Sequence, residues 1–189
     1  MKHTVIVDDD RLRLRPLREK DLPQLVEWLR DPDVWEHLGS ERDFSKKITL
    51  ENETQIFQKN LRDESTIVFA IEAGDGLNFI GTAGLRRVNM RNKRSSVTVI
   101  IGDKREWNKG YGTEALRLLC RYGFTELGLH RISLTVDERH EAGKRCYQKC
   151  GFTAEGVLRE CVREPDGSYH SNVVMSLLEH EWHRLQRGA

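Results

Sequence analysis

The residues best suited to chemistry lie in one stretch, Trp107 to Leu116, which reads Trp-Asn-Lys-Gly-Tyr-Gly-Thr-Glu-Ala-Leu. Gly110 and Gly112 let the backbone approach a ligand closely, and a side chain at Gly112 would fill that space and exclude a positive φ. Apolar residues then recur at helical spacing, so a loop is predicted to run into a helix. Because the first amides of a helix lack partners and lie at the positive end of its dipole, this stretch is predicted to bind phosphate.

Three kinds of loop could have this composition. A nucleoside-triphosphate loop requires Gly-Lys followed by Ser or Thr, and Gly112 is followed by Thr-Glu, which excludes it. The spacing of Gly110, Gly112 and Ala115 matches a dinucleotide fingerprint, and Asp137 ends a later apolar run. That match is weak because polar residues 102–109 separate the preceding apolar run from the first glycine. A glycine turn without a ligand is the third interpretation.

The order of motifs after this loop distinguishes the alternatives. Residues 132–136 alternate as a strand, a short helix ends in Tyr-Gln-Lys-Cys-Gly-Phe at 147–152, and Glu-Gly at 155–156 opens another strand. From Arg11 to Trp182 this order resembles the GNAT acetyltransferases. Trp107 to Leu116, Gly156 and the ending Leu177 to Trp182 are similar to the branch of ribosomal-protein N-terminal acetyltransferases.

The resemblance implies a fold and an activity. The expected fold is a mixed α/β single N-acetyltransferase domain over residues 1–189. Its mostly antiparallel central sheet has about seven strands, is splayed in the middle and is flanked by helices. The expected activity is direct transfer of acetyl from acetyl-CoA to a primary amine, most simply the α-amine of a protein or peptide N-terminus.

The resemblance also implies which residues hold acetyl-CoA. Backbone groups of Val99, Ile100 and Ile101 are expected to pair with the pantetheine arm as an extra strand would. His140, where many relatives have an asparagine, and Lys144 are further expected cofactor contacts. The residues expected to hold the pyrophosphate are Arg105, Trp107, Asn108, Lys109, Gly110, Tyr111, Gly112 and Thr113.

Tyr147 occupies the position of the family's proton-donating tyrosine, which would protonate the leaving CoA thiolate; packing of the helix is the alternative role. The residues expected to contact the acceptor are Trp35, Glu36, His37 and Ser96. No metal is expected. Cys120, Cys146, Cys150 and Cys161 lack zinc spacing and are interpreted as reduced core thiols.

Two departures from the family pattern bear on the acceptor. Many relatives carry a glutamate at the position of Ser96, and some carry one at the position of Thr135; neither residue here can act as a carboxylate base. An α-amine has a pKa of about 7.7 to 8.0 and a polyamine nitrogen one of about 10.4, so the N-terminal amine is favoured. The alternatives are a small-molecule amine or polyamine acetyltransferase, an acyl-CoA-binding module with reduced catalysis, and a nicotinamide-dependent reductase.

Hydrophobic periodicity and turn residues place the elements that must position these groups. Strands are predicted at 11–15, 66–72, 79–88, 96–101, 132–136, 155–163 and 169–178, and helices at 22–29, 32–38, 50–61, 113–127, 140–149 and 179–187. Asp8 to Asp10 is expected to be a solvated lead-in. Met90 to Arg94, with Arg86 and Arg87, concentrates five positive charges at one hairpin, which either is solvated or docks an acidic partner such as the stem of a ribosomal protein.

The length and the charge balance of the chain restrict its possible size class and partners only loosely. The 189 residues suffice for one good core, and 31 Lys plus Arg against 30 Asp plus Glu give a net charge of +1. That balance favours neither nucleic acid nor an anionic membrane as a partner. No apolar run reaches the roughly 18 residues of a membrane span, and residues 1–10 lack a signal peptide's apolar core. A cytoplasmic monomer or homodimer is expected.

Overall fold

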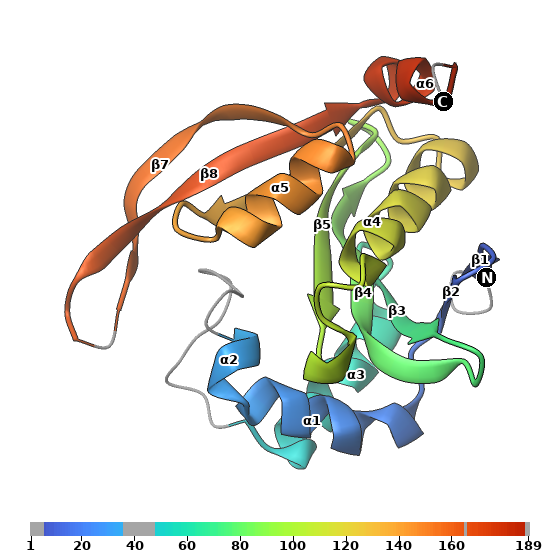
Figure 1. Cartoon of the computed structure of the whole chain (residues 1–189), viewed down its shortest axis with the longest axis vertical. Helices are drawn as coiled ribbons and strands as arrows, with labels where there is room; N and C mark the ends of the chain where they lie inside the picture. The colour runs from blue at the N-terminus through green and yellow to red at the C-terminus, as the bar shows by residue number, and fades with distance from the viewer. Residues whose placement is uncertain (1–5, 36–47, 165, 188–189) are drawn as a thin grey trace.

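The computed structural model describes residues 6–35, 48–164 and 166–187. Its eight strands form one sheet in the order β1-β2-β3-β4-β5-β6-β8-β7 (Figure 1). All neighbouring strands run antiparallel except β5 and β6, which are parallel. The mixed α/β fold and the splayed sheet with flanking helices are as predicted.

The strands are β1 Val7–Asp8, β2 Leu12–Pro16, β3 Ile67–Ala73, β4 Asn78–Asn89, β5 Arg94–Ile101, β6 Arg131–Asp137, β7 Thr153–Arg163 and β8 Tyr169–Leu178. The helices are α1 Leu22–Arg30, α2 Pro32–Trp35, α3 Leu50–Arg62, α4 Tyr111–Arg121, α5 Glu141–Lys149 and α6 Glu179–Arg187. A π-helical turn, Tyr122–Glu126, extends α4. None of these helices combines the length and the apolar character that crossing a membrane requires.

The N-terminal edge strand β1 was not predicted. Asp8, expected to lie in a solvated lead-in, pairs with Arg13, and the adjacent Val7 pairs with Leu14. Val7 is only 8% exposed and belongs to the main core. Two residues are too few to show a strand period in the sequence, so only the pairing with β2 reveals this strand.

The sheet opens between its two halves. β5 pairs with β6 only at Arg94↔Arg131, Ser95↔Ile132 and Ser96↔Ser133. Beyond Ser96 the strands diverge, and residues 97–101 of β5 keep only β4 as a neighbour. Figure 1 shows the β7–β8 hairpin reaching away from β5 and the rest of the sheet.

Two groups of helices pack against the sheet. The buried face of α4 includes Leu116 and Leu119, which belong to the main core, and Tyr122 meets Phe69 of β3 edge-on at 5.5 Å. The α1 and α3 helices share a second cluster. Trp28 of α1 packs so closely on Gly102 that a Cβ there would lie 2.3 Å from the indole ring. Gly102 therefore lets α1 close over the end of β5.

Candidate active site

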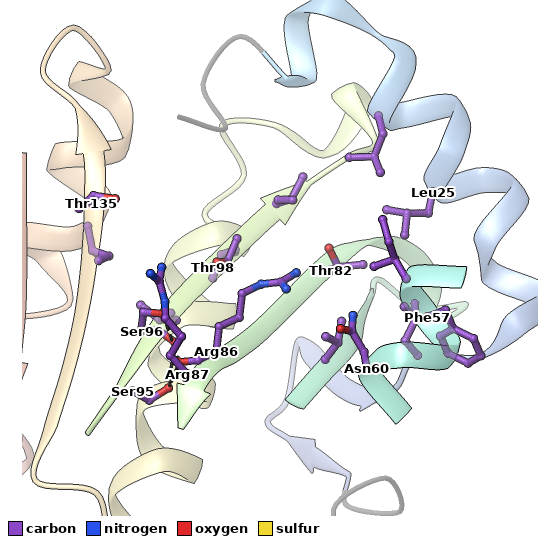
Figure 2. Close-up of a pocket in the computed structure, with 18 of the residues that line it drawn as sticks. Leu25, Phe57, Asn60, Thr82, Arg86, Arg87, Ser95, Ser96, Thr98 and Thr135 are labelled. Carbon is purple, nitrogen blue, oxygen red and sulfur yellow. Dashed lines mark hydrogen bonds between the residues drawn. The ribbon is translucent and has the colours of Figure 1, made fainter. Parts of the chain in front are cut away.

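A cavity of about 1260 Å³ lies where the sheet opens. Its wall combines strands β4, β5 and β6 with helices α1 and α3 (Figure 2). It brings together four of the residues predicted to be catalytic or to bind the cofactor or acceptor, Ser96, Val99, Ile100 and Tyr147. Ile101, the loop 105–113, His140 and Lys144 do not line it. Cavities that bind small ligands typically measure about 300 to 1,000 Å³, so this one has room for more than a small ligand.

The apolar part of the wall comes from the early helices, as the resemblance implies for an acceptor site. Leu25 of α1 and Phe57 of α3 line the cavity on the side away from Ser96 and Thr98 in Figure 2. Among the proposed acceptor contacts, Glu36 and His37 lie outside the described residues, and Trp35 is described only as the last residue of α2. The structure therefore positions Ser96 alone of these four side chains.

The open side of β5 offers backbone groups for the pantetheine arm. The Gly102 amide donates to Ile80 of β4, whereas the Ile101 carbonyl accepts a 2.8 Å hydrogen bond from the Trp107 indole. Backbone groups alternate in direction along a strand. Val99 therefore presents its amide and carbonyl to the gap, and Ile100 directs its own to β4. Of the three residues proposed for this role, Val99 is the one with both groups available.

The glycine loop and the start of α4 form the expected cluster of amides. Within the described chain, the backbone amides of residues 108–112 make no hydrogen bond. Asn108 and Gly110 have positive φ values of 61° and 90°. Gly112, for which a positive φ was expected, does not, and a Cβ there would approach only Ile101, at 3.8 Å. Gly110 provides the conformational freedom that was attributed to Gly112, and Gly112 leaves open space.

Charged residues predicted to hold the cofactor are engaged with neighbours. Arg105 is 87% exposed and binds Asp103 at 2.7 Å, while Lys109 Nζ lies 3.1 Å from Glu106. The main cause of the lowered pKa of Asp103 is its hydrogen bond from Arg105.

Lys144 and His140 lie at the start of α5. Lys144 binds the Glu138 carbonyl at 2.7 Å and the Glu141 carboxylate at 2.6 Å. His140 occupies the N-cap position without a side-chain capping bond, and its ring lies against Gly143, where a Cβ would approach it to 2.3 Å. The amides of the loop are thus better placed to hold phosphate than these side chains.

A residue outside the predicted set fastens the loop. The Arg11 guanidinium binds Glu114 at 2.6 Å, donates to the Lys109 carbonyl at 3.3 Å and lies 5.4 Å from the centre of the Tyr111 ring. The sequence showed Arg11 only as the start of an alternating strand. Its role depends on β2 lying next to the N-terminus of α4, which no local pattern reveals.

Tyr147 lies in the cavity wall on α5. Its ring packs 6.2 Å from Phe152, and its hydroxyl makes no hydrogen bond with any described residue. Burial, and secondarily the neighbouring Cys146 and Cys150, raises the pKa of Tyr147 to about 12. The hydroxyl therefore keeps its proton at neutral pH.

Two thiols lie between the end of α5 and Thr113 in the first turn of α4. Cys146 Sγ lies 3.3 Å from the Thr113 hydroxyl, and the Cys150 thiol donates to the Thr113 carbonyl at 3.5 Å. Hydrogen bonding from Cys150, and then from Thr113, lowers the pKa of the Cys146 thiol below its ordinary value. Of the four cysteines interpreted as core thiols, Cys161 is instead exposed, because it lies on the edge strand β7.

The polar part of the cavity wall is strongly cationic. Among its described residues Glu53 is the single carboxylate, and the uncharged Ser96 and Thr135 also line it. The cations in the wall are Lys59, Arg86, Arg87, Arg94 and Arg131. Arg131 is neutralised by Glu155, which it binds through two contacts of 2.5 and 2.6 Å. No group of three His, Cys, Asp or Glu side chains in the described ranges is arranged to hold a metal ion.

Comparison with known proteins agrees with this geometry. A sequence model of the family described as "Acetyltransferase (GNAT) domain" matches residues 11–153. The uncharacterized N-acetyltransferase YoaA of Bacillus subtilis is 29% identical over 168 residues, which cover 89% of this chain and 94% of YoaA. Spermidine N(1)-acetyltransferase of Escherichia coli K12 is 28% identical over 171 residues, which cover 90% of this chain and 88% of that relative.

A solved structure gives the same fold. Spermidine N-acetyltransferase from Vibrio cholerae, crystallised in complex with CoA and spermine, superposes with a TM-score of 0.82. The match covers 92% of this chain and 99% of that one, at 24% identity. At this identity the likeness concerns the fold.

Proposed function

The chain belongs to the GNAT acetyltransferase family, and we propose that its acceptor is the α-amino group of a protein or peptide N-terminus. The chain is an N-acetyltransferase that takes its acetyl group from acetyl-CoA. Residues 107–116 and the C-terminal motifs resemble those of ribosomal-protein N-terminal acetyltransferases. The N-termini of ribosomal proteins are therefore the first substrates to test.

The observation that carries this proposal is the cationic cavity wall. A polyamine is a multiple cation, and like charges across a binding site repel it. Arg86, Arg87 and Arg94 line the cavity, against the single described carboxylate of Glu53. The same positive charges lower the pKa of any amine bound beside them, because they disfavour its ammonium form. An α-amine, with a pKa of about 7.7 to 8.0, thereby reaches the neutral, nucleophilic form without a carboxylate base.

The proposed transfer is direct. The neutral amine nitrogen attacks the thioester carbonyl, the new C–N bond forms and the C–S bond breaks. The Tyr147 hydroxyl gives its proton to the leaving thiolate, the nitrogen loses its extra proton to water, and water returns a proton to the tyrosinate. Tyr147 is supported by its place in the wall, and its hydroxyl is protonated at neutral pH. The loop 107–113 would hold the pyrophosphate through its amides, and Val99 the pantetheine arm.

A polyamine acceptor is the second candidate, favoured by the name of the Escherichia coli relative. Release of free CoA thiol from acetyl-CoA, measured with neutral peptides, the same peptides blocked at the N-terminus, and spermidine, distinguishes the two. We expect kcat/KM to be higher for the free peptides than for spermidine, and the blocked peptides to be inert. Faster turnover of spermidine than of every peptide would reject the proposal. Tight acetyl-CoA binding without turnover of any amine would instead indicate a binding module.

A further inference from the structure

The five cations of the basic hairpin, which the sequence presents as one group, are divided by the structure. Arg86, Arg87 and Arg94 line the cavity, whereas Arg91 and Lys93 lie in the exposed turn outside it. A hairpin that is only solvated, or that docks a partner through its surface, gives no reason for three of its arginines to line the cavity. The role of these three arginines is therefore to be sought inside the cavity.

A bulge in β4 is what brings two consecutive arginines to the cavity. In a regular strand, side chains at successive positions point to opposite faces. Here the β4–β5 register shifts between Arg86 and Asn89, and Arg87 has a φ of 53°. A positive φ is unfavourable for a residue with a long side chain, and bulges commonly redirect side chains next to active sites. The result is that Arg86 and Arg87 both lie beside Ser96 in Figure 2.

Two serines hold this bulge in place. The Arg86 carbonyl lies 2.9 Å from the Ser95 hydroxyl and 3.2 Å from the Ser96 hydroxyl. Ser95 is buried, at 3% exposure. The strained backbone is thus fixed from the neighbouring strand, at the position where many relatives carry a glutamate. Such support makes the placement of the arginines a feature of the fold rather than a loose surface arrangement.

Two of the three cavity arginines have no charged partner among the residues that the structure describes. The side chains of Arg86 and Arg94 make neither an ion pair nor a hydrogen bond with any residue that the structure describes. Guanidinium groups bind carboxylates through paired, charge-assisted hydrogen bonds. Arg86 is half-buried in the cavity wall and has no carboxylate partner among the described residues, so its guanidinium is suited to bind an anion supplied by the ligand.

The phosphates of acetyl-CoA are too far away to be that anion. Arg94 begins β5 and Ile101 ends it, next to the phosphate loop. Seven residues of strand at about 3.3 Å each separate the two ends by roughly 23 Å. Arg94, and Arg86 beside Ser96, therefore lie towards the end of β5 that is remote from the loop proposed to hold the pyrophosphate.

We infer that this basic group selects acceptors with an anionic group close to the reacting amine, specifically peptide N-termini with Asp or Glu within the first few residues. This inference rests on the proposed N-terminal activity and adds its sequence preference. The volume of the cavity and the exposed positions of Arg87 and Arg94 at its mouth favour an extended peptide over a free amino acid. A peptide N-terminus of this kind and a free acidic amino acid share one feature, an amine with a nearby carboxylate.

The test compares peptides that differ only at positions 2 to 4, as Asp, Asn or Lys, with free aspartate as a small-molecule arm. We expect the wild-type kcat/KM to favour the Asp over the Asn peptide by about tenfold or more, since one charge-assisted hydrogen bond is worth that factor. Arg86→Gln and Arg87→Asn should bring this ratio towards one, because each variant should slow the Asp peptide more than the Asn peptide. Asn is chosen at position 87 because it tolerates a positive φ. Arg91→Gln, on the same hairpin but outside the cavity, should keep the wild-type ratio.

Each outcome has a definite meaning. Equal rates for the Asp and Asn peptides in the wild type, or variants that slow both peptides equally, overturn the inference and leave the proposed function standing. Faster turnover of free aspartate than of the Asp peptide would overturn the inference of a peptide acceptor and would identify a small acidic amino acid as the acceptor. Failure of every peptide rejects both proposals together. The melting temperature and the acetyl-CoA affinity of each variant serve as controls. Both should match the wild type if the Arg86 and Arg87 substitutions leave the fold and the cofactor site intact.

Discussion

The guanidinium of Arg11 binds the carboxylate of Glu114 at 2.6 Å, although 103 residues separate the two in the chain. The contact ties β2 to the first turn of α4. The second carboxylate oxygen of Glu114 is buried and has no hydrogen-bond partner among the described residues. Arg11 is therefore the main compensation for a negative charge that lies beside the proposed phosphate seat.

Arg11→Met should weaken acetyl-CoA binding, because an uncompensated Glu114 repels phosphate and the loop loses its link through the Lys109 carbonyl. We expect the Kd for acetyl-CoA to rise about two- to tenfold, the equivalent of one hydrogen bond, with little change in kcat. Isothermal titration measures the first and thiol release the second. Arg62→Met, which removes an arginine of α3 outside the cavity wall, should leave both unchanged. An unaltered Kd in Arg11→Met would exclude this role for Arg11.

Gly110 and Gly112 should respond differently to substitution. Gly112→Val should abolish acetyl-CoA binding with little loss of stability, because the structure leaves room for the side chain only where the pyrophosphate is proposed to lie. Gly110→Ala should lower the unfolding free energy by about 1 kcal/mol, because φ is 90° there. Calorimetric titration and thermal melts separate the two effects. Native cofactor affinity in Gly112→Val would remove the loop from the binding site.

Tyr147→Phe should lower kcat by about 10²- to 10⁴-fold, the usual contribution of general acid catalysis, and leave acetyl-CoA affinity nearly unchanged. The ring contact with Phe152 is retained in this variant. Because the pKa of Tyr147 is raised to about 12, the wild-type kcat should show no loss with a pKa near 10. A folded Phe variant with normal turnover would leave water to protonate the thiolate.

Thr135→Glu should shift the acceptor preference towards polyamines. Thr135 is an exposed residue of the cavity wall, so the fold should accept the longer side chain. A carboxylate there would both attract a polyamine and assist removal of its proton. The measurement is the ratio of kcat/KM for spermidine to that for a neutral peptide, with Thr135→Gln as the control of equal size. A ratio that rises equally in both variants would show that charge is not the cause.

Cys146 should be the most readily alkylated of the three cysteines on α4 and α5. Hydrogen bonds from Cys150 and Thr113 lower the pKa of Cys146, so more of it is thiolate than for an ordinary cysteine, whereas burial raises the pKa of Cys120. Because Cys146 contacts Thr113, bound acetyl-CoA should slow its reaction with iodoacetamide. Peptide mass mapping with and without acetyl-CoA gives the rates. Equal rates under both conditions would place the cofactor away from Thr113.

The sequence predicts those features of the fold that depend on local periodicity. The seven longer strands and the main helices follow from alternation and helical spacing, because each has enough residues to show its period. β1 does not, since Val7 and Asp8 become a strand only through pairing with β2. The opening of the sheet was implied by family resemblance, because nothing in the apolar runs of β5 and β6 shows that their pairing stops at Ser96.

The site is predictable where backbone chemistry is encoded locally and unpredictable where it depends on distant contacts. The glycine loop could be found because it precedes a periodic helix. The attachment of Arg11 to the loop and the turning of Arg87 into the cavity could not, because the first needs β2 beside α4 and the second needs a bulge. Charged side chains proposed for the cofactor, such as Arg105, were assigned by position, and the structure pairs it with Asp103 instead.

The early end of the β5–β6 ladder makes β5 an edge strand in the middle of a sheet. Like any edge, its gap side presents unpaired amide and carbonyl groups, and Val99 belongs to that side. Exposed edges usually invite pairing with other chains, yet this one is recessed between two halves of the same sheet. Only a slender extended molecule can pair with it. The amide hydrogen of Val99 should consequently exchange with solvent as quickly as that of a surface strand, and become protected when acetyl-CoA completes the sheet.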